Sequence, residues 1–133
     1  MTLNRNDLEA IVICPSNPFL SIAPILSLRG IRANIKSQVA PVVAVSPIVG
    51  GQAIKGPTAK IFTELGHKPS ALEVAHFYTD LIDGLVIDRV DAELAPEIEK
   101  LGVKVKIAQT VMTSERDRVD LARTVLKFAA SMV

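Results

Sequence analysis

Four short apolar runs divide the chain into a pattern typical of strands that alternate with helices. The runs cover residues 10–14, 41–45, 84–88 and 103–107. The first three are apolar without alternation, as strands are when helices cover both faces of a parallel sheet. In the fourth run the apolar residues alternate with Lys104 and Lys106, so we expect an edge strand with one face in solvent.

The segments between these runs carry the boundary residues of helices. Ser70 and Ser114 are each followed three positions later by an acidic residue, the capping-box spacing that opens a helix. Pro57 and Gly66 bracket another helix, because proline suits the first helical turn and glycine the position after the last. Further helices are predicted at residues 21–27, 31–37 and 93–101.

Together these elements predict one α/β domain over residues 1–133. Parallel strands need crossover connections, and the predicted helices have the length for them. The expected fold is therefore a Rossmann-like three-layer structure with a parallel sheet of about four strands joined by crossover helices. We expect this sheet to be incomplete.

Composition narrows the class of protein. Of 133 residues, 49% are hydrophobic and only 4% aromatic, so the predicted core is aliphatic. A single cysteine excludes a disulfide scaffold and a multi-cysteine metal site. The net charge of +1 gives no indication of nucleic acid or a membrane surface as a partner. No apolar run approaches the roughly 18 residues that span a bilayer, and the polar first ten residues do not resemble a signal peptide, which predicts a cytoplasmic protein.

The strongest candidate chemistry follows the second strand, at the edge where such sheets bind ligands. Gly50 and Gly51 let the backbone turn so that its N–H groups converge on an anion, and Lys55 adds a positive charge before the next helix. A phosphate site and a tight structural connection both fit this spacing. The segment is not a P-loop, because its lysine precedes glycine and proline.

The other strand ends carry weaker candidates. Ser16 and Asn17 can hydrogen-bond a nucleotide, but Asn17 can equally cap the helix that follows. For Asp88 a structural role, either an ion pair with Arg89 or a helix cap, is favoured over contact with a ribose hydroxyl or a metal-bound water. Cys14 lacks a neighbouring base, so we expect a small buried thiol rather than a nucleophile. The catalytic residues are unknown at this stage, and no metal ligands are evident.

Two loops are more specific together than either is alone. The first reads Ile-Cys-Pro-Ser-Asn-Pro at residues 13–18, and the second reads Ser-Pro-Ile-Val-Gly-Gly at 46–51, with Lys-Gly-Pro at 55–57. Further matching stretches lie at 70–72, 101–103 and 110–113 and in the last helix around Arg118. Over essentially the whole chain after residue 9, the sequence resembles the 2-phospho-L-lactate transferase family of coenzyme F-420 biosynthesis.

The resemblance implies a Rossmann-like, Mg²⁺-dependent transferase. Members of this family move a phospholactyl or phosphoenolpyruvyl group from a guanosine diphosphate conjugate to the hydroxyl of a deazaflavin and release GMP. By matching position, Ser16, Asn17 and Pro18 would belong to the nucleotide pocket. The residues that would line the diphosphate and acyl side are Ser46, Gly50, Gly51, Lys55 and Gly56.

The resemblance also implies that this chain corresponds to the C-terminal part of a longer transferase. The N-terminal part of such a protein carries a glycine-rich turn and the aspartates associated with metal and acceptor binding. We therefore expect little activity from the chain alone, and an N-terminal partner half or a homodimer as its assembly. The alternative is a non-catalytic, nucleotide-binding regulatory domain of the related gluconeogenesis-factor type. The two loops favour the transferase, but they do not distinguish a lactyl from an enolpyruvyl donor.

Overall fold

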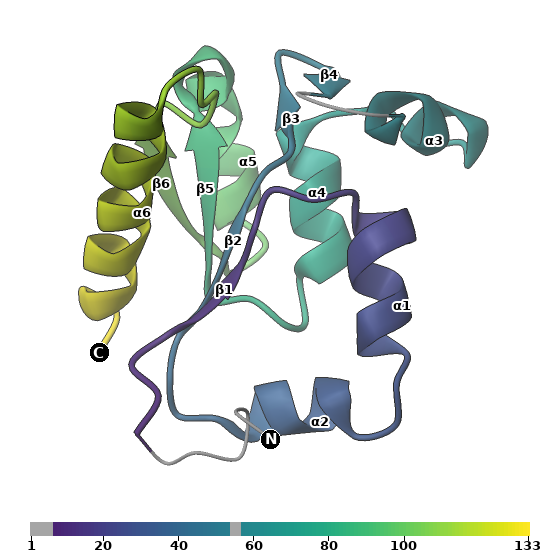
Figure 1. Ribbon diagram of the computed structural model, residues 1–133. Coiled ribbons are helices and arrows are strands. Elements are labelled where there is room, and N and C mark those ends of the chain that lie inside the picture. Colours follow the sequence, from purple (N-terminus) through teal and green to yellow (C-terminus); the bar gives the residue numbers. More distant parts are fainter. Residues whose placement is uncertain (1–6, 54–56) are drawn as a thin grey trace.

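The computed structural model describes residues 7–53 and 57–133 (Figure 1). Its centre is a four-stranded parallel sheet in the order β1-β2-β5-β6. These strands are β1 (Ile11–Ile13), β2 (Val42–Val45), β5 (Gly84–Asp88) and β6 (Lys104–Ala108). The register pairs Val12 with Val43, and Leu85 with both Ala44 and Val105. All four strands lie where the apolar runs predict them, and β6 is an edge strand as its lysines indicate.

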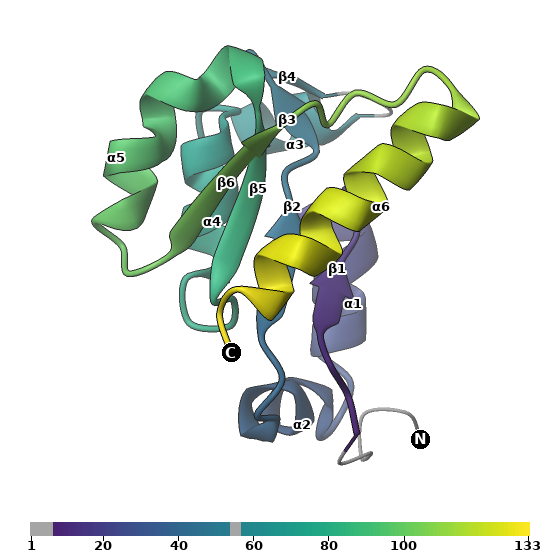
Figure 2. The same ribbon diagram turned by 90° about the vertical axis from the view of Figure 1, so that its left-hand side faces the viewer.

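Helices cover both faces of the sheet, which confirms the Rossmann-like three-layer α/β fold (Figures 1 and 2). The described α-helices are α1 (Ala23–Leu26), α2 (Ile31–Ser37), α3 (Thr58–Glu64), α4 (Ala71–Tyr78), α5 (Ala95–Glu99) and α6 (Glu115–Ala130). A π-helical turn, η2 (Pro18–Ile22), precedes α1, and a 3₁₀-helix, η3 (Arg89–Leu94), precedes α5. Among these helices α6 covers one face of the sheet, and residues of α1 to α5 contribute to the core on the other.

The predicted capping residues open their helices. The hydroxyl of Ser70 accepts a hydrogen bond from the Glu73 N–H, and Ser114 accepts one from the Asp117 N–H, both at 3.1 Å. Pro96 lies in the first turn of α5, the place where proline costs no hydrogen bond. These contacts confirm the helix starts that the sequence predicts at α4 and α6.

A β-hairpin between β2 and α3 was not predicted. Its strands are β3 (Ile48–Val49) and β4 (Gln52–Ala53), joined by a turn at Gly50 and Gly51. Both glycines have positive φ, 58° and 80°, as a two-residue hairpin turn of type I′ requires. Strands of two residues are too short to show a period of two, so the sequence pattern indicated only a loop.

The expectation that β1 is covered on both faces is wrong. The side chain of Val12 is 38% exposed, and Cys14 just beyond the strand is exposed as well. The reason is that α6 packs on Val43, Val45 and Val86, which belong to β2 and β5, and leaves β1 at the open edge of the sheet. The buried thiol expected at Cys14 is therefore corrected to an exposed one.

The lengths and compositions of the helices indicate whether any of them could cross a membrane. Among the residues that the structure describes, no helix combines the length and the apolar character that crossing a bilayer requires. The cytoplasmic location inferred from composition stays a prediction.

Candidate functional site

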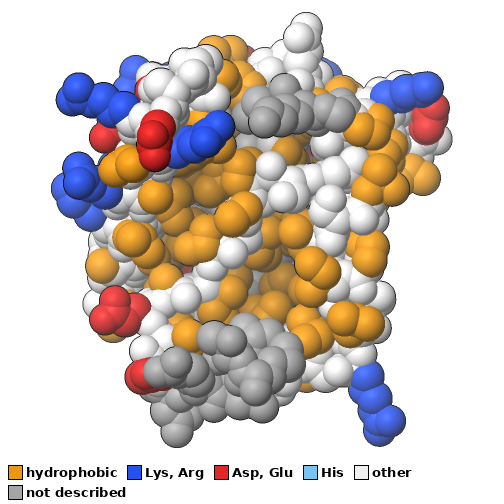
Figure 3. Space-filling view, in the orientation of Figure 1, with side chains coloured by type: hydrophobic (Ala, Val, Ile, Leu, Met, Phe, Trp, Pro, Cys, Tyr) orange, Lys and Arg blue, Asp and Glu red, His pale blue; other side chains and the backbone are white. Residues whose placement is uncertain are grey.

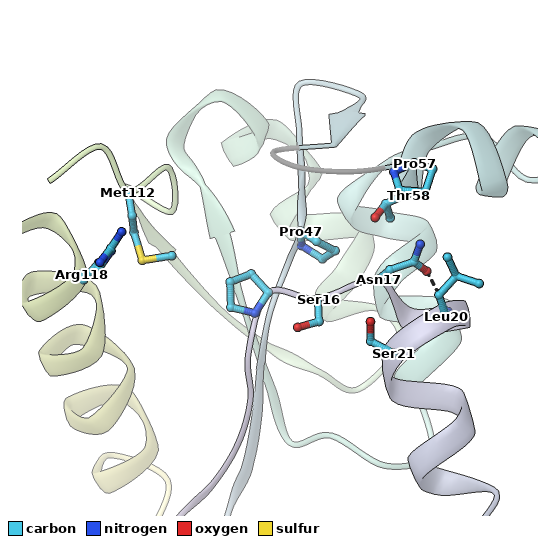
Figure 4. Close-up of a pocket in the computed structure, with 10 residues that line it drawn as sticks. Ser16, Asn17, Leu20, Ser21, Pro47, Pro57, Thr58, Met112 and Arg118 are labelled. Atoms are coloured by element: carbon cyan, nitrogen blue, oxygen red, sulfur yellow. Dashed lines mark hydrogen bonds between the residues drawn. The ribbon is translucent and has the colours of Figure 1, made fainter. Parts of the chain in front are cut away.

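A pocket lies where the loops after β1 and β2 leave the sheet, at the edge where parallel sheets bind ligands (Figure 4). Its volume of about 400 Å³ falls in the usual range for small-molecule sites. The residues that line it are Pro15, Ser16, Asn17, Leu20, Ser21, Pro47, Pro57, Thr58, Met112 and Arg118. Figure 4 shows Met112 and Arg118 on one side, Ser16 between, and Asn17 and Thr58 on the other.

Asn17 has two roles within this pocket. Its Oδ1 accepts hydrogen bonds from the N–H groups of Phe19 at 2.9 Å and Leu20 at 3.1 Å, so the capping role considered from sequence is confirmed. Its Nδ2 is buried and has no hydrogen-bond partner among the residues that the structure describes. A buried donor without an acceptor costs about 1–3 kcal/mol, which a ligand oxygen at this position would recover.

Arg118 stands on the opposite side of the pocket, in the first turn of α6. It forms no ion pair with another residue of the described chain. The nearby Arg116 does form one, with its Nε 3.9 Å from Oδ2 of Asp120. A cation at a helix N-terminus opposes the helix dipole, so this position does not favour the fold. Within the described lining Arg118 is the one charged side chain, and it is available for an anionic ligand.

The structure brings only part of the predicted site together. Ser16 and Asn17 line the pocket, while Pro18 is buried in the core beside it. Ser46 is fully buried, and its hydroxyl is used by the backbone of Ile48, from whose N–H it accepts at 3.2 Å and to whose carbonyl it donates at 3.1 Å. Two further predicted residues, Gly50 and Gly51, form the turn of the hairpin. The last two, Lys55 and Gly56, lie outside the described residues.

The hairpin turn binds a carboxylate of the chain itself. The Gly50 N–H donates to both oxygens of the buried Asp91 carboxylate, at 3.2 and 3.1 Å. Burial raises the pKa of Asp91, the Gly50 N–H opposes this, and the nearby Asp88 and Glu93 carboxylates raise it further, so the pKa lies above its usual value. The turn does present an N–H group to an anion, but in this structure Asp91 accepts it.

Asp88 holds the carboxyl ends of β5 and β6 together. One oxygen accepts from the Thr110 N–H at 2.9 Å and the Thr110 hydroxyl at 3.1 Å, and the other accepts from the Val90 N–H at 3.1 Å. Burial raises the pKa of Asp88, but these hydrogen bonds outweigh it and the pKa lies below its usual value. Of the two structural roles favoured from sequence, the helix cap is confirmed, since the Val90 bond caps η3.

The described residues do not fit a magnesium site. Within residues 7–53 and 57–133 there is no group of three or more His, Cys, Asp or Glu side chains that could hold a metal ion. The two buried carboxylates beside the hairpin, Asp88 and Asp91, are already used by backbone N–H groups.

Several lining residues were not predicted as site residues. Ser21, Thr58 and Met112 come from separate segments; Met112 lies in the matching stretch 110–113, but no residue type or spacing there indicates a ligand contact. Arg118 carried a signal that could have been used, because it follows the predicted cap Ser114 by four residues. That spacing places a cation in the first helical turn, where it is electrostatically unfavourable unless it has another use.

Comparison of the sequence with known proteins shows the family of the chain. The sequence model of the family described as 2-phospho-L-lactate transferase CofD matches residues 3–126. The chain belongs to this transferase family. The 2-phospho-L-lactate transferase of Methanocaldococcus jannaschii is 43% identical over 124 residues, 93% of this chain and 38% of that protein. That of Methanothermobacter thermautotrophicus is 40% identical over 118 residues, 89% of this chain and 38% of that protein.

The transferase family includes relatives named for another acid. The phosphoenolpyruvate transferase of Streptomyces griseus is 37% identical over 122 residues, 91% of this chain and 38% of that protein. Membership of the family therefore leaves open which acid is transferred. The chain spans about 38% of the length of these relatives, so more than half of each has no counterpart here.

Proposed function

We propose that this chain supplies the nucleotide-binding part of a transferase. The complete enzyme would move a phospholactyl or phosphoenolpyruvyl group from a guanosine diphosphate conjugate to a deazaflavin hydroxyl and release GMP. One observation carries the proposal beyond family membership. Asn17 and Arg118 line one pocket, and Asn17 Nδ2 and the Arg118 guanidinium are donors for which the described chain provides no acceptor.

A diphosphate ester matches these donors because its oxygens only accept hydrogen bonds. In the proposed reaction the acceptor hydroxyl oxygen attacks the phosphorus that carries the acid, and a new P–O bond forms. The bond from that phosphorus to the GMP oxygen breaks, and GMP leaves with the electron pair. Transfers of this kind depend mainly on positioning and on stabilising charge at the phosphate oxygens, the role that we propose for Asn17 and Arg118.

The hydroxyl must also lose its proton, and the pocket has no group for this step. Its described lining contains no carboxylate, histidine or lysine. The base, and the Mg²⁺ ligands that the resemblance implies, would have to come from other residues of a complete transferase. We therefore propose that the chain alone binds the nucleotide and transfers little or nothing.

Calorimetry with GDP tests the binding step. Arg118→Gln should weaken GDP binding by at least tenfold, since a hydrogen bond to a charged group contributes about 1.5–3 kcal/mol. Arg123→Gln is the matched control on the same helix, because Arg123 is exposed and does not line the pocket. Asn17→Asp should weaken binding while it keeps the cap of η2, because an aspartate oxygen can accept the same N–H groups.

Two results would contradict the assignment: no heat of binding with millimolar GDP, or equal affinity of Arg118→Gln and the wild type. Guanosine without phosphates should bind much more weakly than GDP, because Arg118 has nothing to pair with. Equal binding of the two would exclude the diphosphate as the group that this pocket recognises.

The absence of a base from the described lining also favours a second candidate, a non-catalytic nucleotide-binding domain. The two candidates differ in activity once the rest of a transferase is supplied. Assays with the guanylated donor, the deazaflavin and Mg²⁺ should show no product with the chain alone. Robust product from the chain alone would overturn the proposed dependence on other residues, and no product from any assembly would favour the non-catalytic alternative.

A further inference from the structure

An apolar groove runs along the open edge of the sheet, between β1 and α6. It has a volume of about 470 Å³, and its apolar walls include Val12, Cys14, Leu121, Val125 and Leu126. Val12 is 38% exposed and Leu126 57%. Figure 3 shows the hydrophobic side chains gathered over the centre of this face, with Lys and Arg side chains at its rim. A patch of this kind on an edge strand is typical of an interaction surface.

The two edges of the sheet differ in a way that points to β1. The edge strand β6 carries Lys104 and Lys106, both exposed, and lysines on an edge strand discourage pairing with another chain. The edge strand β1 reads Ile-Val-Ile and has no charge. Because Ile11 donates its N–H to Pro41 of the β2 side, the N–H and C=O of Val12 point outward to the free edge.

The groove is also continuous with the pocket of the proposed site. Pro15, Met112 and Arg118 line both. A polypeptide seated in the groove would therefore form a further wall of the pocket, close to the donors assigned to the diphosphate. This is the side from which the base that the described lining lacks can be supplied.

We propose that the groove and the edge of β1 dock the remaining polypeptide of a complete transferase, which adds a strand beside β1. The occupant follows from length, since more than half of each matched relative lies outside the region shared with this chain. A strand beside β1 pairs the outward backbone groups of Val12, and its apolar side chains cover the exposed side chains of Val12 and Leu126. The identity of the partner rests on the proposed function, whereas the surface itself rests on the geometry.

The test is to co-express the chain with the Methanocaldococcus jannaschii transferase from which the 124 matched residues have been removed. We expect a one-to-one complex by light scattering. Cys14 provides a direct probe, because it is the single cysteine of the chain and lies in the groove. A maleimide should modify Cys14 at least tenfold more slowly in the complex, measured by mass spectrometry of its peptide.

Hydrogen exchange reports the added strand independently. The Val12 amide should become protected in the complex. The Val105 amide is the matched control, because Lys104 donates its N–H to Asp83 on the β5 side and the next amide on β6 therefore points outward. It should exchange at the same rate with and without the partner.

Variants separate the groove from the rest of the surface. Val12→Lys should weaken the complex at least tenfold, and Ile107→Lys, at a similarly exposed apolar position on β6, should not. Leu126→Lys and Val119→Lys make a second pair on α6, of which only Leu126 lines the groove, in case the first variant fails to fold.

No complex, a homodimer that protects Cys14, or a complex in which Cys14 reacts at its original rate would each overturn the proposal. A complex without transferase activity would leave the docking surface in place and contradict the proposed function. GDP binding without any complex would support the proposed nucleotide site and contradict the docking surface. The two proposals can therefore fail separately.

Discussion

Replacing Asp88 by asparagine removes the charge that joins the ends of β5 and β6. The carboxylate accepts three hydrogen bonds, two from Thr110 and one from the Val90 N–H. Asparagine can keep its oxygen toward Thr110, but its NH₂ group then faces the Val90 N–H, donor against donor. The loss of one charged hydrogen bond with an unpaired buried donor predicts a destabilisation of about 2–4 kcal/mol.

The lowered pKa of Asp88 determines how the stability difference between wild type and Asp88→Asn changes with pH. The folded pKa of Asp88 lies below its usual value, so the ionised carboxylate stabilises the fold above the unfolded pKa. That stabilisation is lost as pH falls through the folded pKa. The gap in unfolding free energy between wild type and Asp88→Asn should thus be full at pH 7 and should shrink below about pH 4.

Asp91→Asn is the matched comparison with the opposite sign. Its folded pKa is raised, so the wild type is favoured below the unfolded pKa and loses that advantage as pH rises through the folded pKa. Asparagine keeps an oxygen for the Gly50 N–H and carries no buried charge. We therefore expect Asp91→Asn to be at least as stable as wild type at pH 7, with no such advantage near pH 3.

Urea unfolding followed by circular dichroism, at intervals from pH 3 to pH 7, measures both variants. A wild-type urea midpoint for Asp88→Asn at pH 7 would refute the reasoning, as would a gap that widens on acidification. Equal behaviour of the two variants would show that burial, and not the number of hydrogen bonds, controls these carboxylates.

Three further predictions concern the core and the helix starts. Tyr78→Phe should be at least as stable as wild type in thermal unfolding, because burial raises the pKa of Tyr78 and its buried hydroxyl has no hydrogen-bond partner within residues 7–53 and 57–133. Gly84→Ala should cost about 1–3 kcal/mol, since a Cβ there would clash with the Met132 side chain and would lie 2.7 and 2.9 Å from atoms of the Phe128 ring; Phe128→Leu in the same chain should recover the part that the ring causes. Ser70→Ala should cost about 1 kcal/mol by loss of the cap on Glu73, which Ser70→Asp should restore.

Much of the fold could be predicted because its signals are local. The apolar runs predict β1, β2, β5 and β6, and the serine caps predict the starts of α4 and α6. The hairpin of β3 and β4 could not be predicted in the same way. Its two-residue strands have no periodicity, and the bond from Gly50 to Asp91 joins residues 41 positions apart.

In the candidate site, too, only the residues marked by a local signal could be predicted. Ser16 and Asn17 could be predicted because they follow a strand directly, at the ligand-binding edge of a parallel sheet. Whether the other predicted residues face the same pocket depends on how each loop turns. Ser46 turns its hydroxyl to the backbone of Ile48 and lies away from the pocket lining.

The sequence by itself determined the class of fold, the strand positions and the family resemblance, because periodicity, caps and loop motifs are properties of neighbouring residues. Only the tertiary structure decided that Arg118 faces Asn17 across a pocket and that β1 leaves an apolar edge open. Both depend on the placement of α6 over β2 and β5, and therefore on packing between segments that are far apart in the sequence. The same placement explains why Cys14, expected in the core, lies on the surface.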